Sequence, residues 1–289
     1  MIGILGFSFK AILIKLAYSW DPVDPVTLLA LRMIYSMPFF AAMAWWASKS
    51  PETRPMRRPD WLVLLWLGFI GYYLASLLDF VGLRYISASL ERLVQFLYPT
   101  MVVLLSVALL KKRVGGRIWI ALALSYAGIL LVFQHDLRMV SDIGGFWLGT
   151  ALVFASAFCY ALYLVGAGPV IARLGSLRFI AWAMLTSAVF VIAQFMITRP
   201  LTALAAPVSI QLLSLVMAVI STVLPTFLVA EAIKRIGANR TSLIGSLGPV
   251  FTIGLGWWIL GEAVHWLQLI GAALVLGGVT LVTMKPSTP

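Results

Sequence analysis

The amino-acid sequence predicts an all-α integral membrane protein with ten transmembrane helices, arranged as two inverted five-helix repeats. Three observations lead to this prediction: an apolar composition, a series of apolar segments of nearly membrane-spanning length, and a match between the two halves of the chain. Of the 289 residues, 62% are hydrophobic and 11% are charged, whereas about a quarter of the residues in a soluble domain are charged. The composition therefore indicates that the chain folds in a lipid bilayer.

The apolar segments set the number of expected helices. A hydrocarbon layer of about 30 Å requires roughly twenty residues of helix. The first segment carries two lysines and continues into the next element without a cleavage site, so we expect it to be both targeting signal and structural helix. The expected helices are Ile2–Tyr18, Pro25–Ala47, Trp61–Leu83, Ser87–Leu110, Ile118–Phe133, Gly145–Val165, Leu177–Ile197, Ile210–Ile233, Thr241–Leu260 and Trp266–Met284.

Basic residues in the short loops predict the orientation, because cytoplasmic loops are enriched in Lys and Arg. If the N-terminus is inside, the outer loops hold only Arg84, Arg138 and Arg199, and the other loop Lys and Arg residues are inside. An even number of spans then places both termini in the cytoplasm. Tryptophans near the segment ends agree, because the indole ring prefers the headgroup layer; they are Trp20, Trp45, Trp46, Trp61, Trp119, Trp147 and Trp266.

The two halves of the chain match each other without gaps at an offset of 150 residues, which aligns Pro99 with Pro249 and Gly128 with Gly278. This match predicts a first repeat over residues 1–135 and a second over residues 143–285. Because each repeat has an odd number of spans, the second repeat must be inverted relative to the first. Inverted repeats are typical of secondary transporters, in which two halves expose a midplane site alternately to each side.

Three short stretches also carry a family resemblance: Gly6–Lys10 followed by Lys15, Leu31–Met33, and Ser89–Arg92 ahead of Leu97–Pro99. Together with the span count and the repeat, they resemble the drug/metabolite transporter superfamily, and specifically its EamA-type ten-helix transporters. The resemblance covers essentially the whole chain. It implies an exporter or exchanger of amino acids or other small metabolites, with the fourth and ninth helices lining a central cavity, and it does not specify the substrate.

Charged side chains inside the apolar segments are candidate site residues, because a charge in the bilayer centre costs from a few to more than about ten kcal/mol. Lys10 lies near the middle of the first span, and we expect it to face the substrate, with structural pairing as the alternative. The others form either ion pairs that hold helices together or an outer gate that opens when a carboxylate is protonated or the substrate competes. These expected gating residues are Lys15, Arg32, Asp79, Glu91 and Arg92.

The acidic residues among them are also candidates for proton coupling. Asp79 and Glu91 are the outer candidates, and Glu231 is the candidate on the inner side. Protonation of a buried carboxylate changes the charge of its surroundings, which is the property that coupling to a proton gradient requires.

Polar residues form stripes at helical spacing, as in Tyr72, Ser76 and Asp79 or Glu91, Gln95 and Tyr98. Residues spaced i, i+4 and i+7 share one helix face, so these stripes predict a cavity suited to a zwitterion or small polar molecule. Two mid-span prolines are expected either to act as hinges or to form static kinks. The expected cavity residues are Lys10, Tyr72, Ser76, Gln95, Tyr98, Pro99, Tyr160, Tyr163, Ser246 and Pro249.

Other functional classes have little support in the sequence. No glycine-rich phosphate loop is present, and His135 and His265 fall in or beside outer loops without a paired metal ligand. The net charge of +11 is spread over the loops, which does not favour nucleic-acid binding. We therefore expect a non-enzymatic transporter without cofactor or metal, in contact with lipid and a small-molecule substrate in a bacterial inner membrane. The alternative is a non-transporting membrane subunit or a lipid-handling protein.

Overall fold

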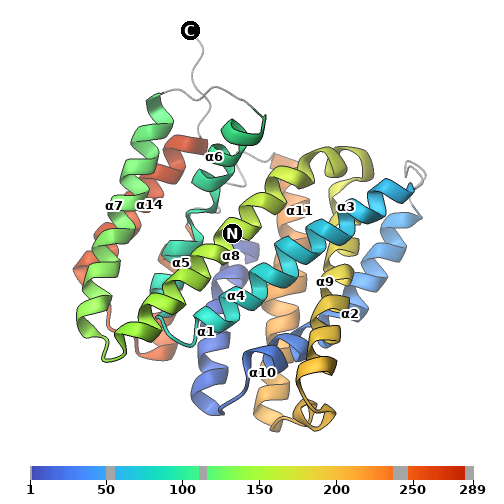
Figure 1. The fold of residues 1–289 in the computed structure, drawn as a ribbon, viewed down its shortest axis with the longest axis horizontal. Coiled ribbons are helices and arrows are strands. Elements are labelled where there is room, and N and C mark those ends of the chain that lie inside the picture. The colour runs from blue at the N-terminus through green and yellow to red at the C-terminus, as the bar shows by residue number, and fades with distance from the viewer. Residues whose placement is uncertain (1, 50–55, 111–115, 237–246, 284–289) are drawn as a thin grey trace.

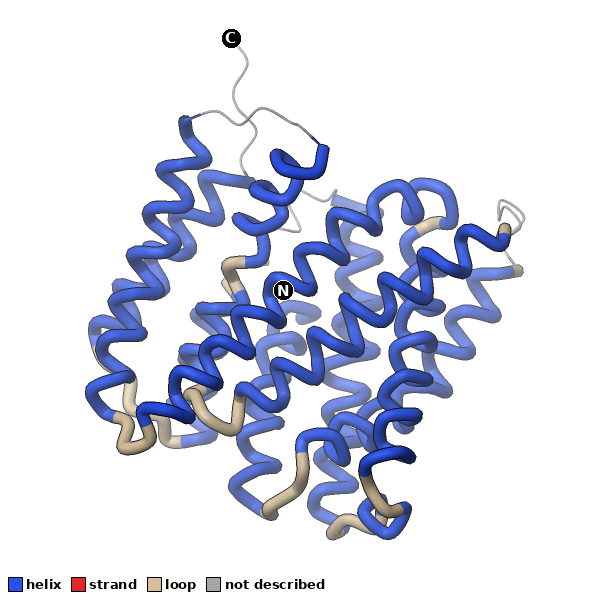
Figure 2. Tube along the Cα trace, in the orientation of Figure 1, coloured by secondary structure: helices blue, strands red, loops and turns tan. Residues whose placement is uncertain are grey.

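The computed structural model describes residues 2–49, 56–110, 116–236 and 247–283, and the regular elements in these ranges are all helices (Figures 1 and 2). Two shorter apolar helices, Gly248–Leu260 and Trp266–Leu281, accompany seven helices that are long and apolar enough to cross a membrane. The all-α prediction is confirmed for the described residues. The seven helices are Pro25–Ser48, Arg58–Gly82, Ala88–Leu109, Trp119–Arg138, Ile143–Leu174, Ser176–Thr198 and Val208–Val229.

The first half begins with α1 and α2, and Asp24 caps the second of these by accepting a hydrogen bond from the Thr27 backbone N–H. A π-helical segment, η1, joins α3 and α4 into one helix, and a turn at Phe96 and Leu97 separates α5 from α6. The elements are α1 (Ile2–Trp20), α2 (Pro25–Ser48), α3 (Arg58–Gly68), η1 (Phe69–Leu74), α4 (Ala75–Gly82), α5 (Ala88–Gln95), α6 (Tyr98–Leu110) and α7 (Gly116–Met139).

The second half repeats this pattern with a longer first helix. The sequence predicted that this helix would end at Val165, but it continues through Pro169 to Leu174. Gly166, the first residue after the predicted end, stays helical and lies against Leu67. The elements are α8 (Ile143–Leu174), α9 (Ser176–Thr198), η2 (Leu201–Leu204), α10 (Val208–Ala218), η3 (Val219–Val223), α11 (Leu224–Ile236), α13 (Gly248–Leu255), η4 (Gly256–Leu260) and α14 (Trp266–Thr283).

Four pairs of elements start 150 residues apart, which equals the sequence offset. The π-helical segments η1 and η3 start at Phe69 and Val219, and the helices before them start at Arg58 and Val208. Likewise α6 and α13 start at Tyr98 and Gly248, and α7 and α14 start at Gly116 and Trp266. The backbone therefore bends and breaks at equivalent places in both halves.

The packing of the helices follows the same relation. The related helices α7 and α14 lie side by side on one flank of the bundle (Figure 1), and the related helices α2 and α9 also pack together. In addition, α1 packs against α11 and α13, whereas α8 packs against α4, η1 and α6. Each half thus inserts its first helix against the other half, and the two halves form one interlocked bundle.

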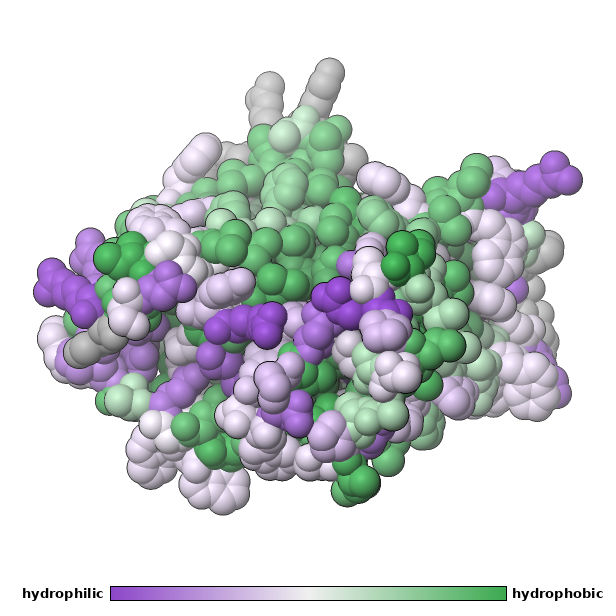
Figure 3. Space-filling view, turned by 60° about the horizontal axis from the view of Figure 1, so that its bottom comes forward, coloured by the Kyte–Doolittle hydropathy of each residue, from purple (hydrophilic) through white to green (hydrophobic). Residues whose placement is uncertain are grey.

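The outer surface carries the features of a membrane protein. Figure 3, which turns the lower end of Figure 1 forward, shows hydrophilic side chains gathered across that end and hydrophobic side chains over the surface behind it. All seven tryptophans that were predicted to lie near span ends are exposed. Such residues anchor helices at the headgroup layer, so their exposure fits the predicted belt; they are Trp20, Trp45, Trp46, Trp61, Trp119, Trp147 and Trp266.

Replacement of Gly128 by Leu is expected to destabilise the α7–α14 pair. A Cβ atom on Gly128 would meet the Gly271 carbonyl and lie 3.0 Å from the Leu274 Cβ atom, and overpacking of such contacts costs about 1–3 kcal/mol. The same replacement at Gly277 is the control, because nothing lies within 4 Å of a Cβ there. Thermal unfolding of the purified variants measures the difference, and equal melting temperatures for the two variants would contradict the prediction.

Candidate functional site

The centre of the candidate site is a buried ion cluster of Lys10, Asp79 and Glu91. The Lys10 Nζ atom lies 2.6 Å from Asp79 Oδ2 and 3.9 Å from Glu91 Oε1. Helices α1, α4 and α5 supply the three residues. Asp79 is 1% exposed and Glu91 is fully buried, so two carboxylates share one ammonium group away from solvent. Such an arrangement is costly in a bilayer, which makes the cluster a candidate functional site.

Two arginines surround this ion cluster. Arg32 is 4% exposed, donates a hydrogen bond from Nη2 to Ser76 Oγ (3.1 Å), and places its guanidinium 4.8 Å from the centre of the Phe80 ring. The Arg92 guanidinium lies 5.4 Å from the centre of the Phe96 ring and interacts electrostatically with Glu91. If the two arginines and the three residues of the ion cluster are all charged, their net charge is +1.

Several buried polar atoms of this region have no hydrogen-bond partner among the described residues. Buried polar groups in proteins are normally satisfied, so a group of unsatisfied atoms indicates water, an ion or a ligand. Here these atoms converge on one region, where they include both donors and acceptors. Apart from the two carboxylate oxygens that pair with Lys10, they are Arg32 Nε, Arg92 Nε, Asp79 Oδ1 and Glu91 Oε2.

Four tyrosines of the polar stripes contact one another, and two of them, Tyr98 and Tyr160, interact electrostatically with Arg92. The Tyr72 and Tyr163 hydroxyl groups share a hydrogen bond of 3.1 Å. The Tyr98 ring packs edge-on against Tyr160 at a centroid distance of 5.2 Å, and Tyr160 stacks on Tyr163 at 5.6 Å. Gly71 makes this arrangement possible, because a Cβ atom there would overlap the Tyr163 ring. The tyrosines come from both halves of the chain, so this group lies where the halves meet.

Hydrogen bonds connect the polar stripes of α5 and α8. Gln95 Nε2 donates to Ser156 Oγ (3.0 Å), and Ser156 Oγ donates to the Ala75 carbonyl (2.7 Å). Ser156 is fully buried, and these bonds join α5, α8 and α4 at one level. The stripe residues therefore contact each other directly in this structure.

The remaining predicted residues lie elsewhere. Pro99 and Pro249 each occupy the second position of a new helix, α6 or α13, where a missing N–H costs little, so they follow a break in the helix and do not lie within a continuous one. Ser246 lies outside the described residues. Glu231 lies in α11, which is separated from α10 by η3.

Lys15 has Glu262 as its electrostatic partner. The lysine that pairs with Asp79 and Glu91 is therefore Lys10 and not Lys15.

Sequence reasoning missed Glu262, which connects the two halves. Its carboxylate accepts hydrogen bonds from the Ala88 backbone N–H (2.9 Å) and from Ser89 Oγ (2.8 Å) at the start of α5. The available signal was the Ser-Ala-Ser stretch at residues 87–89, because a helix start has unpaired N–H groups that attract an anion. Glu262 directly follows an apolar segment, which made it resemble an ordinary loop residue.

Two further ion pairs across the halves were also missed. Arg199 donates hydrogen bonds from Nε (2.9 Å) and Nη2 (2.8 Å) to Asp24, and Arg173 forms an ion pair with Asp60. Partial burial disfavours the charged form of Asp24, but hydrogen bonds from Arg199 and from the Thr27 backbone N–H outweigh it, and they hold the pKa of this carboxyl below its ordinary value. These residues lie at or near the ends of helices, outside the predicted apolar segments, where a sequence gives no pairing rule.

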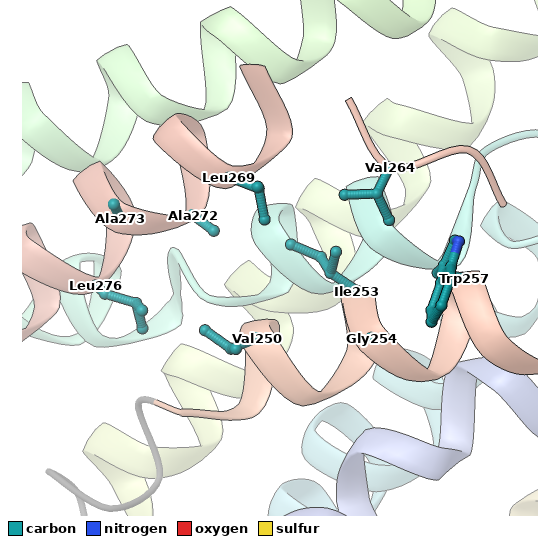
Figure 4. Close-up of a pocket in the computed structure, with 9 residues that line it drawn as sticks. All are labelled: Val250, Ile253, Gly254, Trp257, Val264, Leu269, Ala272, Ala273 and Leu276. Carbon is teal, nitrogen blue, oxygen red and sulfur yellow. The ribbon is translucent and has the colours of Figure 1, made fainter. Parts of the chain in front are cut away.

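An apolar groove of about 430 Å³ lies apart from this site, between α13, η4 and α14 (Figure 4). Ligand pockets of this size usually contain a few polar groups that orient the ligand, but its lining side chains are apolar. The groove therefore suits a hydrocarbon chain better than a polar solute. Its lining residues are Val250, Ile253, Gly254, Trp257, Val264, Leu269, Ala272, Ala273 and Leu276.

Each half of the chain matches the model of one family, the EamA-like transporter family, over residues 1–134 and 147–284. The chain belongs to this family. The predicted family membership is therefore confirmed, and the EamA-like chain is a multi-pass protein of a membrane transporter family.

Relatives of this EamA-like chain carry the same general description. The chain is 30% identical to the uncharacterized transporter YcbK of Bacillus subtilis, over 98% of this chain and 89% of that protein. It is 23% identical to the uncharacterized inner membrane transporter YhbE of Escherichia coli, over 96% of this chain and 85% of that protein. A crystal structure of a protein with 22% identity superposes with a TM-score of 0.64 over 96% of this chain and 95% of the other, which shows a shared fold.

Replacement of Lys10 by Met is expected to destabilise the protein, because it leaves two buried carboxylates without their nearest cation. Removing one partner of a buried pair typically costs about 3–5 kcal/mol. Combining Lys10→Met with Glu91→Gln is expected to recover part of this loss, because only one buried carboxylate then remains. Thermal unfolding in detergent measures both effects.

The exposed residue Lys49 provides the control, since Lys49→Met removes a lysine that forms no ion pair with the cluster. If Lys10→Met and Lys49→Met lowered the melting temperature equally, the ion cluster would not contribute to stability.

Proposed function

We propose that this protein is a secondary transporter that carries small metabolites, such as amino acids or related zwitterions, across the bacterial inner membrane by alternating access. It acts as an exporter or an exchanger. The observation that carries the proposal is the buried cluster of Lys10, Asp79 and Glu91, together with the unsatisfied polar atoms around it. A membrane bundle with only a structural role has no need of such a group, because burial of charge in lipid is costly.

The proposed topology consists of ten membrane-spanning helices in two inverted repeats, residues 1–135 and 143–285, with both termini in the cytoplasm. Four pairs of elements that start 150 residues apart support this topology. The exchanged packing of α1 and α8 supports it as well, because a two-fold relation between the halves requires such reciprocity. Two related halves can then rock about a shared midplane and expose the site to one side at a time.

The proposed substrate class follows from the charges and rings at the site. A zwitterion presents one carboxylate and one ammonium group, and the site offers Lys10, Arg32 and Arg92 to the former and Asp79 and Glu91 to the latter. The neighbouring tyrosines add polar hydroxyl groups on flat, apolar rings. This combination suits a small organic zwitterion better than an inorganic ion, because flat rings provide packing surface for a carbon skeleton.

The proposed energy source is a proton gradient, with Asp79 or Glu91 as the proton acceptor. Both carboxylates contact the same Lys10 ammonium group. When one of them takes up a proton, its attraction to Lys10 decreases, and the contacts between α1, α4 and α5 weaken. Proton uptake would thereby favour separation of these helices and opening of the site.

The apolar groove supports a second candidate, a non-transporting membrane subunit or a lipid-handling protein. The groove between α13, η4 and α14 has the size and lining to hold a hydrocarbon chain. The ion cluster has no role in this alternative. We therefore favour the transporter.

Cells that express the gene are expected to differ from cells that lack it in the distribution of at least one zwitterionic metabolite between medium and cytosol. Metabolite profiling of both compartments measures this difference and identifies the solute. Uptake of that solute by liposomes containing the purified protein then tests direct transport. If the pure protein moves no solute under any gradient but binds a membrane partner stoichiometrically, the subunit alternative replaces the transporter.

Replacement of Glu91 by Gln is expected to abolish the pH dependence of solute flux, because Gln retains the shape of Glu91 but does not titrate. Asp79→Asn is the parallel variant, and size-exclusion chromatography checks that each variant folds. The measurement is flux into liposomes over a range of pH values. If neither variant changes the pH dependence, neither residue carries the coupled proton.

A further inference from the structure

Three contacts join the two halves at the end of the bundle where α5 and α14 begin. Asp24 binds Arg199, Asp136 accepts a hydrogen bond from Gln268 Nε2 (3.4 Å), and Glu262 binds the start of α5. The first pair is partly exposed, with side chains 28% and 38% accessible, and such pairs contribute little to stability. The second contact is long. Glu262 differs from the other two contacts because it binds backbone N–H groups at the start of a helix.

The Glu262 latch, which consists of Glu262, Ala88 and Ser89, satisfies backbone groups that α5 cannot satisfy itself. The first N–H groups of a helix have no partner within the helix. Ser87 Oγ accepts from the Leu90 N–H (3.1 Å), and the Glu262 carboxylate accepts from the N–H groups of Ala88 (2.9 Å) and Ser89 (3.4 Å). Ala88 and Ser89 are buried, so separation of the latch would leave buried donors without an acceptor until water entered.

Local geometry holds the Glu262 latch in place. The Glu262 backbone N–H donates to the Gly256 carbonyl (3.1 Å), and Gly261 adopts a positive φ of 67°, a conformation that favours glycine. A Cβ atom on Gly256 would lie 3.0 Å from the carboxylate of Glu262. The turn between η4 and α14 therefore directs this carboxylate at α5, and the absence of a side chain on Gly256 gives it room.

The latch is mechanically connected to the ion cluster by two helices. Ser89 and Glu91 lie in the same turn of α5, so the helix that the latch fixes also carries one carboxylate of the cluster. Lys15, which interacts electrostatically with Glu262, lies on α1 together with Lys10. Any movement of α5 or α1 that changes the cluster must therefore also strain or release the latch.

We propose that Glu262 is a gating residue, which keeps the outer end of the transporter closed by capping α5 across the two halves. This inference rests on the proposed function for its meaning as a gate. Outward opening requires the Glu262 carboxylate to leave Ala88 and Ser89. Glu262 acts through the position of α5 and does not contact the solute.

The test measures how fast a membrane-impermeant thiol reagent reaches a buried position from outside intact cells. The reporter is Ala11→Cys in a Cys159→Ser background, because Ala11 lies one turn inward of Lys15 on the same face of α1 and is 2% exposed. Glu262→Ala is expected to increase the labelling rate roughly tenfold, as loss of hydrogen bonds to a charged group shifts the equilibrium towards the open form. Glu262→Gln and Ser89→Ala are expected to give smaller increases.

Asp142→Asn is the matched control. Asp142 also caps a helix at this end, by accepting from the Gly145 N–H (2.9 Å), but it does so within its own half. Unchanged labelling with both Glu262 variants, or an equal increase with Asp142→Asn, would overturn the gating role. The labelling needs no solute, so failure of the latch and failure of the proposed transport are separate results.

Discussion

The cost of burying charge in hydrocarbon is the constraint on which the rest of this structure depends. Lys10, Asp79 and Glu91 lie inside apolar helices, so each can remain there only with a partner of opposite charge. Because the partners come from α1, α4 and α5, this requirement fixes how three helices of the first half meet. The same requirement makes the site sensitive: any event that changes one charge changes the contacts among all three helices.

Because the two halves are interlocked, these contacts also connect one half to the other. Since α1 packs against α11 and α13 of the second half, Lys10 connects carboxylates of the first half to a helix embedded in the second. The π-helical segments η1 and η3 lie at equivalent places, and such segments often occur at functional sites. Tyr72 of η1 reaches Tyr163 of α8, so one of these segments directly contributes to the contact between halves.

Much of the architecture could be predicted from the sequence because it depends on local properties. Apolar runs set most helix boundaries to within a few residues, and helical spacing placed Tyr72, Tyr98, Tyr160 and Tyr163 on polar faces whose rings contact one another in the structure. The pairing of charges was not predictable in this way. Lys10 and Lys15 lie five residues apart on one helix, and only the packing of α4 and α5 decides that Lys10 meets the carboxylates. The role of Glu262 was hidden for the same reason, since its partner lies 174 residues away.

The two halves have similar backbones but differ in charge at equivalent positions. At the interval of 150 residues, Lys10 corresponds to Tyr160 and Asp79 to Val229, so the first half supplies charge where the second supplies neutral groups. In an alternating-access transporter, two equivalent halves would give inward-open and outward-open forms of nearly equal energy, because a two-fold rotation would convert one form into the other. The charged residues of one half remove this equality. Under the proposed alternating-access mechanism, a solute or proton that binds these residues would shift the balance between the two forms, which is the requirement for coupling binding to movement.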